Sequence, residues 1–177
     1  MAKYIILDRD GIINEDIGYT HKIKDLRILP KVIEGLKKFR DAGFKFIAIT
    51  NQAGIARGIY TQDDMEKFHN ELRVRLAKSY IKIEKFYHCP HHPKLTGNCE
   101  CRKPNTALVR LAEQEFDFKA SESIFIGDKD SDVELGNNCK GTTVLIENDQ
   151  YPNEIKPNFK AKNLSHAFDL LKSAKLI

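Results

Sequence analysis

The chain has 177 residues, the size of one ordinary domain, and 41% of them are hydrophobic, which is enough for a buried core. Its 29 Lys and Arg residues stand against 25 Asp and Glu, an excess too small and too dispersed to predict a nucleic-acid groove. No apolar run reaches the roughly 20 residues that cross a bilayer, and the N-terminal residues lack a signal-peptide pattern. We therefore expect a monomeric cytoplasmic protein, a single domain over 1–177, that binds neither nucleic acid nor membranes.

Short apolar runs and helix-period patterns alternate along the chain. The runs that predict strands are 4–7, 44–49, 81–87, 123–126 and 142–146. The patterns that predict helices are 32–42, 61–76, 106–116, 130–138 and 164–171. Thr61 and Asp64 resemble a capping box at the start of the second helix, and the 148–159 stretch, which contains two prolines, predicts a loop. This alternation predicts a doubly wound, Rossmann-like α/β fold with a parallel sheet of about five strands.

Acidic side chains follow two of the predicted strands. In doubly wound sheets, ligands bind beside the carboxyl ends of the strands; Asp8 and Asp10 follow the first strand, and Asp128 follows the fourth. Carboxylates two residues apart at a strand end can face one site, where their repulsion favours a bound cation. Mg²⁺ suits such a site because it binds through few carboxylates and keeps several waters. A solvated acidic turn would account for the first pair alone, but not for the matching Asp128.

Neutral polar side chains follow the second predicted strand, and a cationic pair precedes the predicted helix at 106–116. Thr50, Asn51 and Gln52 offer hydroxyl and amide groups to phosphate oxygens, although the same residue types are ordinary turn formers. Arg102 and Lys103 precede a predicted helix, and cations beside a helix N-terminus attract negative charge. An exposed basic pair explains those two residues equally well.

A cluster of cysteines and histidines follows the third predicted strand. In a chain without an export signal, such a cluster indicates a metal site rather than disulfides. Three thiolates and one imidazole form the closed tetrahedral set of a structural zinc site, with no open position to activate water. The predicted zinc ligands are Cys89, His91, Cys99 and Cys101. Either His88 or His92 could take the place of His91 in this set.

Four segments resemble the motifs of the haloacid dehalogenase-like phosphatases, in the order of that family. They are 4–14 (YIILDRDGIIN), 49–58 (ITNQAGIARG), 89–104 (CPHHPKLTGNCECRKP) and 125–132 (FIGDKDSD). Within this superfamily the chain is most similar to the zinc-loop branch of heptose bisphosphate and histidinol phosphatases, and the 16–21 segment resembles a substrate loop of that branch. The resemblance implies strand order 3-2-1-4-5. No gap between the motifs is long enough for a cap domain, so the zinc loop, 88–104, would help to shape the site.

The resemblance also implies a role for each site residue. Asp8 would attack phosphorus and form an aspartyl-phosphate, and Asp10 would protonate the leaving oxygen. Asp8, the main-chain carbonyl of Asp10 and Asp128 would bind Mg²⁺. Thr50 and Lys103 would stabilise the phosphoryl group in transfer. The residues expected to contact the rest of the substrate are Asp16, Gly18, Tyr19, Asn51, Gln52, Arg102 and Lys129.

The expected activity is a magnesium-dependent hydrolase of carbohydrate metabolism that removes the C7 phosphate of a D-glycero-D-manno-heptose 1,7-bisphosphate. Histidinol phosphate is the alternative substrate for the same chemistry. A receiver-type phosphoacceptor domain is the alternative from another class, but its acceptor Asp lies on a middle strand and lacks an acid two residues later. A zinc-dependent nucleic-acid module is a third alternative, which the near-balanced charge supports poorly.

Overall fold

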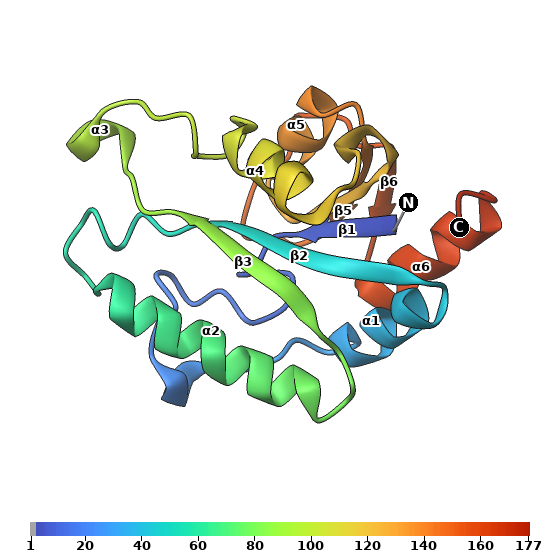
Figure 1. Cartoon of the computed structure of the whole chain (residues 1–177), viewed down its shortest axis with the longest axis horizontal. Helices are drawn as coiled ribbons and strands as arrows, with labels where there is room; N and C mark the ends of the chain where they lie inside the picture. The colour runs from blue at the N-terminus through green and yellow to red at the C-terminus, as the bar shows by residue number, and fades with distance from the viewer. Residues whose placement is uncertain (1–2) are drawn as a thin grey trace.

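The computed structural model describes residues 3–177, which form a layered α/β fold (Figure 1). The strands are β1 (Lys3–Leu7), β2 (Phe44–Asn51), β3 (Ile83–Cys89), β4 (Ile124–Gly127), β5 (Thr142–Ile146) and β6 (Phe159–Ala161). The helices are α1 (Val32–Asp41), α2 (Gln62–Ala77), α3 (Pro93–Thr96), α4 (Ala107–Phe116), α5 (Asp130–Asn138) and α6 (Leu164–Ser173). Short 3-10 turns occupy Ile23–Asp25 and Ala120–Glu122. None of the helices within this range has the length and apolar character needed to cross a membrane.

All six strands form one parallel sheet in the order β3-β2-β1-β4-β5-β6. This order contains the expected 3-2-1-4-5 arrangement, so the predicted fold class is confirmed. The sheet has one strand more than predicted, because β6 pairs with β5 through only three residues. A segment of that length is too short to show a hydrophobic period. The same limit explains why the four-residue helix α3 was not predicted.

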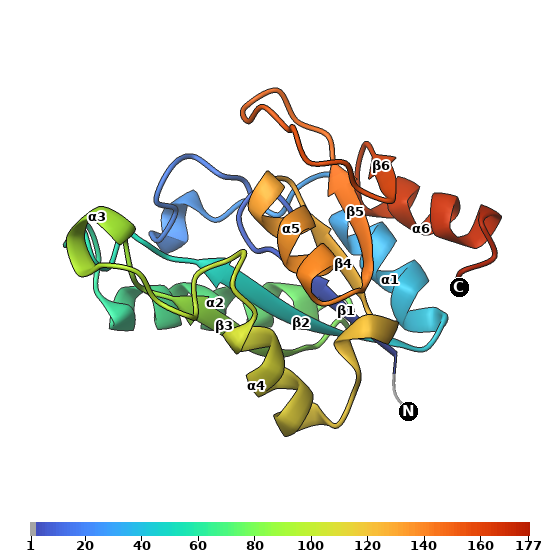
Figure 2. The same ribbon diagram turned by 90° about the horizontal axis from the view of Figure 1, so that it is seen from above.

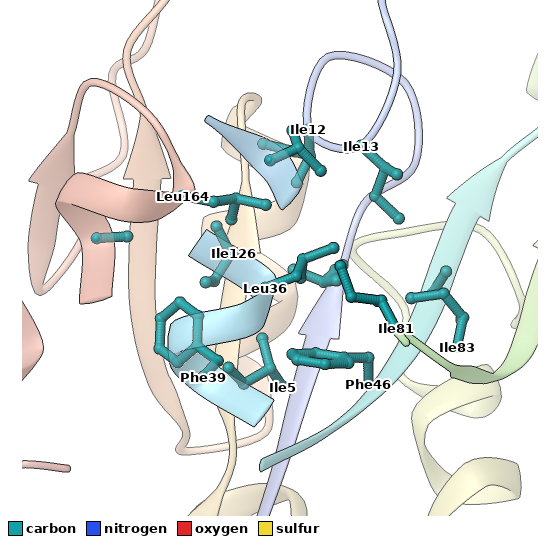
Figure 3. Close-up of a cluster of buried hydrophobic side chains, with 14 of the residues drawn as sticks. Ile5, Ile12, Ile13, Leu36, Phe39, Phe46, Ile81, Ile83, Ile126 and Leu164 are labelled. Atoms are coloured by element: carbon teal, nitrogen blue, oxygen red, sulfur yellow. The ribbon is translucent and has the colours of Figure 1, made fainter. Parts of the chain in front are cut away.

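Helices cover both faces of the sheet: α1, α2 and α6 lie on one side, and α4 and α5 on the other (Figure 1). The larger core lies between the sheet and helices α1, α2 and α6, and it includes the aromatic and aliphatic side chains of Figure 3. Strand β1 is buried on both faces, which explains its uninterrupted apolar sequence. Ile5 and Leu7 point into the larger core, whereas Tyr4 and Ile6 point into the smaller core on the opposite face.

The connections at the carboxyl end of the sheet place the site. Strand β1 pairs with β2 on one side and β4 on the other, so the point where strand order reverses lies beside it. Asp8 N donates to Ile126 O at 3.0 Å, which ties the end of β1 to β4. The predicted capping box is confirmed at the start of α2, where Asp64 N donates to Thr61 Oγ1 at 3.1 Å. Figure 2 shows the segment after β1 and the β5–β6 segment on the same side of the molecule.

Candidate active site

Three buried carboxyl groups meet where β1 and β4 end. Asp8, Asp128 and Asp132 each offer an oxygen within 4.8 Å of the other two. Asp132 reaches the cluster from the first turn of α5 because Gly127 has no side chain: a Cβ there would lie 2.1 Å from the Asp132 Cβ. Sequence reasoning missed Asp132, although its position four residues after Asp128, at the start of a predicted helix, was a usable signal.

The electrostatics of this cluster fit an oxygen-ligated cation. Asp128 Oδ1 is buried and finds no hydrogen-bond partner among residues 3–177. Burial, followed by the charge of Asp8, raises the pKa of Asp128 to about 8. An unpartnered carboxylate oxygen beside two further carboxylates is the donor set that a divalent cation takes. The Asp10 carboxylate lies outside this set, which leaves its main-chain carbonyl as the group expected to contact a metal.

Lys103 neutralises part of the negative charge. Its Nζ lies 2.9 Å from Asp8 Oδ1 and 2.6 Å from Asp132 Oδ1, and it donates to Ile49 O at 2.8 Å. Burial acts to lower the pKa of Lys103, but the two carboxylates outweigh it and raise that pKa. Asn51 fixes the main chain of this residue, since Asn51 Oδ1 accepts from Lys103 N at 3.0 Å. Lys103 is therefore held as an ammonium beside the predicted nucleophile.

Gln52 joins Thr50 to Asp10. The Gln52 amide donates to Asp10 Oδ2 at 3.0 Å and to Thr50 Oγ1 at 2.8 Å. Its Oε1 accepts from the Tyr60 hydroxyl at 2.5 Å, and burial raises the pKa of Tyr60 to about 12, so that hydroxyl stays a donor. Gln52, predicted to contact substrate, thus has both ends of its amide engaged within the protein.

A cavity of about 410 Å³ opens at these groups. It brings together every predicted catalytic and substrate-contacting residue, although these come from five separate stretches of the chain. The predicted residues that line it are Asp8, Asp10, Asp16, Gly18, Tyr19, Thr50, Asn51, Gln52, Arg102, Lys103 and Lys129. Sequence reasoning missed the other lining residues, which are Ala53, Tyr60, His92, Ser131 and Tyr151.

Tyr151 is the most informative of the missed residues. Its hydroxyl donates to Asp16 Oδ2 at 3.0 Å, and its ring lies 4.5 Å from Lys129 Nζ. Lys129 Nζ is itself 3.1 Å from Asp16 Oδ2. Burial acts to lower the pKa of Lys129. The pKa is nevertheless raised, because the negative charges of Asp8, Asp128 and Asp16 outweigh burial. The segment between β5 and β6, expected to be a plain loop, therefore holds the predicted substrate loop in place (Figure 2).

The same segment also contacts the carboxylate cluster. Asn148 Nδ2 donates to Asp128 Oδ2 at 3.1 Å and is 3.3 Å from Asp128 O. In the sequence, 17 residues (147–163) separate the predicted strand at 142–146 from the predicted helix at 164–171. That length was a signal that sequence reasoning did not use, because connections of more than about 12 residues in compact domains are often functional.

The predicted zinc ligands gather at the end of β3, which Cys89 closes, and in the segment that follows. Their sulfur atoms are 3.0 to 3.6 Å apart, and His91 Nδ1 lies 3.2 and 3.7 Å from two of them. Zinc–sulfur bonds of about 2.3 Å in a tetrahedron separate the sulfurs by roughly 3.7 Å. The cluster is compatible with a zinc site, and its histidine is His91 rather than the alternatives His88 and His92. Arg102 Nη1 donates to His91 O at 3.3 Å, which links this segment to the cavity.

A doubly wound sheet with this arrangement of aspartates and a buried lysine at its switch point defines a haloacid dehalogenase-like phosphatase. A family model described as HAD-hydrolase-like matches residues 100–170. A Campylobacter jejuni protein named D-glycero-alpha-D-manno-heptose-1,7-bisphosphate 7-phosphatase is 39% identical over 172 residues, 97% of this chain and 96% of the relative. The chain belongs to the family of D-glycero-D-manno-heptose-1,7-bisphosphate 7-phosphatases, which are phosphoric monoester hydrolases.

Two further comparisons agree with this assignment. A Haemophilus influenzae protein named as the phosphatase of the beta anomer is 35% identical over 144 residues, 79% of this chain and 78% of the relative. The crystal structure of D,D-heptose 1,7-bisphosphate phosphatase from B. bronchiseptica, complexed with magnesium and phosphate, has a TM-score of 0.86 to this chain. That similarity covers 97% of this chain and 99% of the other at 23% sequence identity, and it shows the shared fold.

Proposed function

We propose that the protein removes the C7 phosphate of D-glycero-D-manno-heptose 1,7-bisphosphate. The observation that carries this proposal is the content of the cavity, where Asp8 lies beside the Lys103 ammonium and two further cations, Arg102 and Lys129, line the same space. One phosphate of the substrate would bind at Asp8 and Lys103. The other would bind to the remaining cations, which suits a substrate with two phosphates. Residues 1–177 would act as a single phosphatase domain.

The proposed reaction has two steps. The Asp8 carboxylate attacks phosphorus and the bond to the sugar oxygen breaks, while Asp10 donates a proton to that oxygen. Water then attacks the aspartyl-phosphate, Asp10 takes a proton from it, and inorganic phosphate leaves. Thr50 and Lys103 would stabilise the phosphoryl group during both steps, since phosphoryl transfer depends mainly on positioning and charge.

Two metal ions fit the proposal. Asp8 and Asp128, with the Asp10 carbonyl, would hold Mg²⁺, which supplies neutralisation of phosphoryl charge when bound. Three carboxyl groups share one ammonium there, and a divalent ion would favour the ionised form of Asp128, whose pKa is raised without it. Zn²⁺ at the cysteine cluster would be structural and would fix Arg102 and Lys103 just beyond its last ligand. The monomeric state and the cytoplasmic location stay predictions.

Phosphate release in the presence of Mg²⁺ tests the proposal directly. Both anomers of the heptose 1,7-bisphosphate and histidinol phosphate are compared as substrates, with Asp8→Asn as the control. We expect turnover of a bisphosphate, and a fall of roughly 10³-fold or more in kcat for the control because the nucleophile is gone. A preference for histidinol phosphate would keep the chemistry and overturn the substrate. Release from none of them would contradict the proposed function.

A further inference from the structure

A buried arginine connects the proposed acid to helix α2. Arg9 is 0% exposed, and it donates to both oxygens of the neighbouring carboxylate, through Nε to Asp10 Oδ1 at 2.9 Å and through Nη2 to Asp10 Oδ2 at 2.7 Å. On its other side, Arg9 Nη1 lies 3.1 Å from His69 Nε2. Because a guanidinium has donors only, His69 Nε2 must be the acceptor, and a neutral ring then carries its proton on Nδ1.

The surroundings of His69 hold its ring in this position. The residue is 3% exposed, and its ring stacks on Phe86 of β3 with centroids 4.5 Å apart. The preceding residue, Phe68, packs against Arg9: the Arg9 guanidinium lies 4.7 Å from the centroid of the Phe68 ring. Two consecutive residues of α2 therefore fix the guanidinium from one side, without lining the cavity themselves.

Arg9 also contacts the substrate loop. Its Nη2 donates to Thr20 O at 2.7 Å, at the end of the segment that carries Asp16 and Tyr19. The guanidinium thus has three kinds of partner: the proposed acid, the substrate loop and α2. Of these partners, only the α2 contacts come from a regular element that lies outside the cavity, so they are the fixed reference for the other two.

We propose that His69 is a positioning residue for Asp10, and that it acts by accepting a hydrogen bond from Arg9. Without this acceptor, a buried Nη1 donor would lose its partner, and the guanidinium would turn toward other acceptors at the expense of its paired contact with Asp10. The Asp10 carboxyl would then lie out of line with the leaving oxygen. The inference rests on the proposed role of Asp10 as the acid.

In the first step, which ends with loss of the leaving group and sets kcat/KM, the proton from Asp10 matters only where that group needs it. A sugar alkoxide is strongly basic and requires protonation as it leaves, whereas p-nitrophenolate leaves readily as an anion. A misplaced Asp10 should therefore lower kcat/KM for the heptose bisphosphate far more than for p-nitrophenyl phosphate. The ratio of the two constants does not depend on the fraction of folded enzyme, so it separates positioning from a loss of stability.

The experiment measures this ratio in matched variants of the full chain with Mg²⁺. His69→Leu removes the acceptor, and His69→Asn places an amide oxygen one methylene short of the Nε2 position. His69→Gln restores an uncharged acceptor close to that position. Leu72→Ala, one turn along α2 and also buried, destabilises the same core without touching Arg9.

We expect the ratio to fall at least about tenfold in His69→Leu and His69→Asn, part of the roughly 10²- to 10⁴-fold that acid catalysis contributes. His69→Gln should recover most of it, and Leu72→Ala should keep the wild-type ratio. Should the Leu variant fail to fold, the Asn and Gln pair gives the same comparison.

Asp10→Asn separates the two hypotheses. If the ratio collapses in Asp10→Asn but stays at the wild-type value in the Leu and Asn variants, the role of His69 is wrong. A fall that Gln does not restore would also overturn the acceptor role. If the ratio is unchanged in Asp10→Asn itself, the assignment of Asp10 as the acid fails instead.

Discussion

The floor and the wall of the cavity are built in different ways. The floor consists of Asp8 and Lys103, which line the cavity, together with Asp128 and Asp132, whose carboxyl groups cluster with Asp8; each of the four is at most 6% exposed, and Lys103 pairs with Asp8 and Asp132. The wall consists of the 15–21 loop and the 148–158 segment, where Tyr19 is 42% exposed and the segments meet through hydrogen bonds such as that from Tyr151. We infer that the floor sets the chemistry and the wall sets which substrate reaches it.

The largest effect is expected from removing the lysine of the floor. Lys103→Met leaves Asp8 and Asp132 without their shared counter-ion, and breaking a buried pair in this way costs about 3–5 kcal/mol of unfolding free energy. We expect kcat to fall by roughly 10³-fold as well, because phosphoryl transfer loses a fixed positive charge. Denaturant unfolding and turnover measure the two effects.

A surface lysine provides the control for that variant. Lys85 pairs with Glu115 where both side chains are about 40% exposed, and such pairs contribute about 0–1 kcal/mol. Lys85→Met should therefore be close to wild type in stability and turnover. Equal losses of stability and turnover in Lys103→Met and Lys85→Met would contradict the special role of the buried lysine.

Loss of metal from the cysteine cluster should displace the catalytic groups of the floor, although the cluster itself lies outside it. The cluster lies two residues before Lys103, and Arg102 bonds to His91 O, so a disordered segment would move both cations. A shift of about 1 Å in a catalytic group costs roughly 10²-fold in rate. Chelated, zinc-free protein assayed with Mg²⁺ restored should show this loss, and full turnover would refute the link.

The buried contact between Arg9 and His69 should make the stability of the protein sensitive to acid. Burial, and then Arg9, lower the pKa of His69 to about 2, so the folded state refuses a proton that the unfolded chain binds below about pH 6.5. Its contribution to stability is complete above that pH and is lost as pH falls, at about 1.4 kcal/mol per pH unit. In unfolding titrations from pH 7 to 4, His69→Gln should lose less stability than wild type, and parallel curves would contradict this.

The smallest effect is expected at the wall. Tyr151→Phe removes one hydrogen bond to Asp16 and keeps the ring beside Lys129, so KM should rise about 2- to 10-fold with kcat nearly unchanged. Tyr80→Phe is the matched control, because Tyr80 is 86% exposed and does not line the cavity. A fall in kcat with constant KM would place Tyr151 with the floor instead.

Much of the fold and the site could be predicted because the signals are local. Strand and helix periods are read within one element, and Asp8 and Asp128 each directly follow a strand. The predicted zinc ligands lie within one short segment, so their spacing alone indicated that they would cluster. Strand β6 and helix α3 escaped prediction because three or four residues carry no period.

The sequence by itself determined the alternation of strands and helices, the acidic residues at strand ends and the cysteine and histidine cluster, since each depends on neighbours in the chain. Only the tertiary structure decided which distant groups meet. His69 contacts Arg9 across 60 residues, and Tyr151 contacts Asp16 across 135. No local pattern records such contacts, because they exist only once the sheet has set its strand order and brought separate loops to one edge.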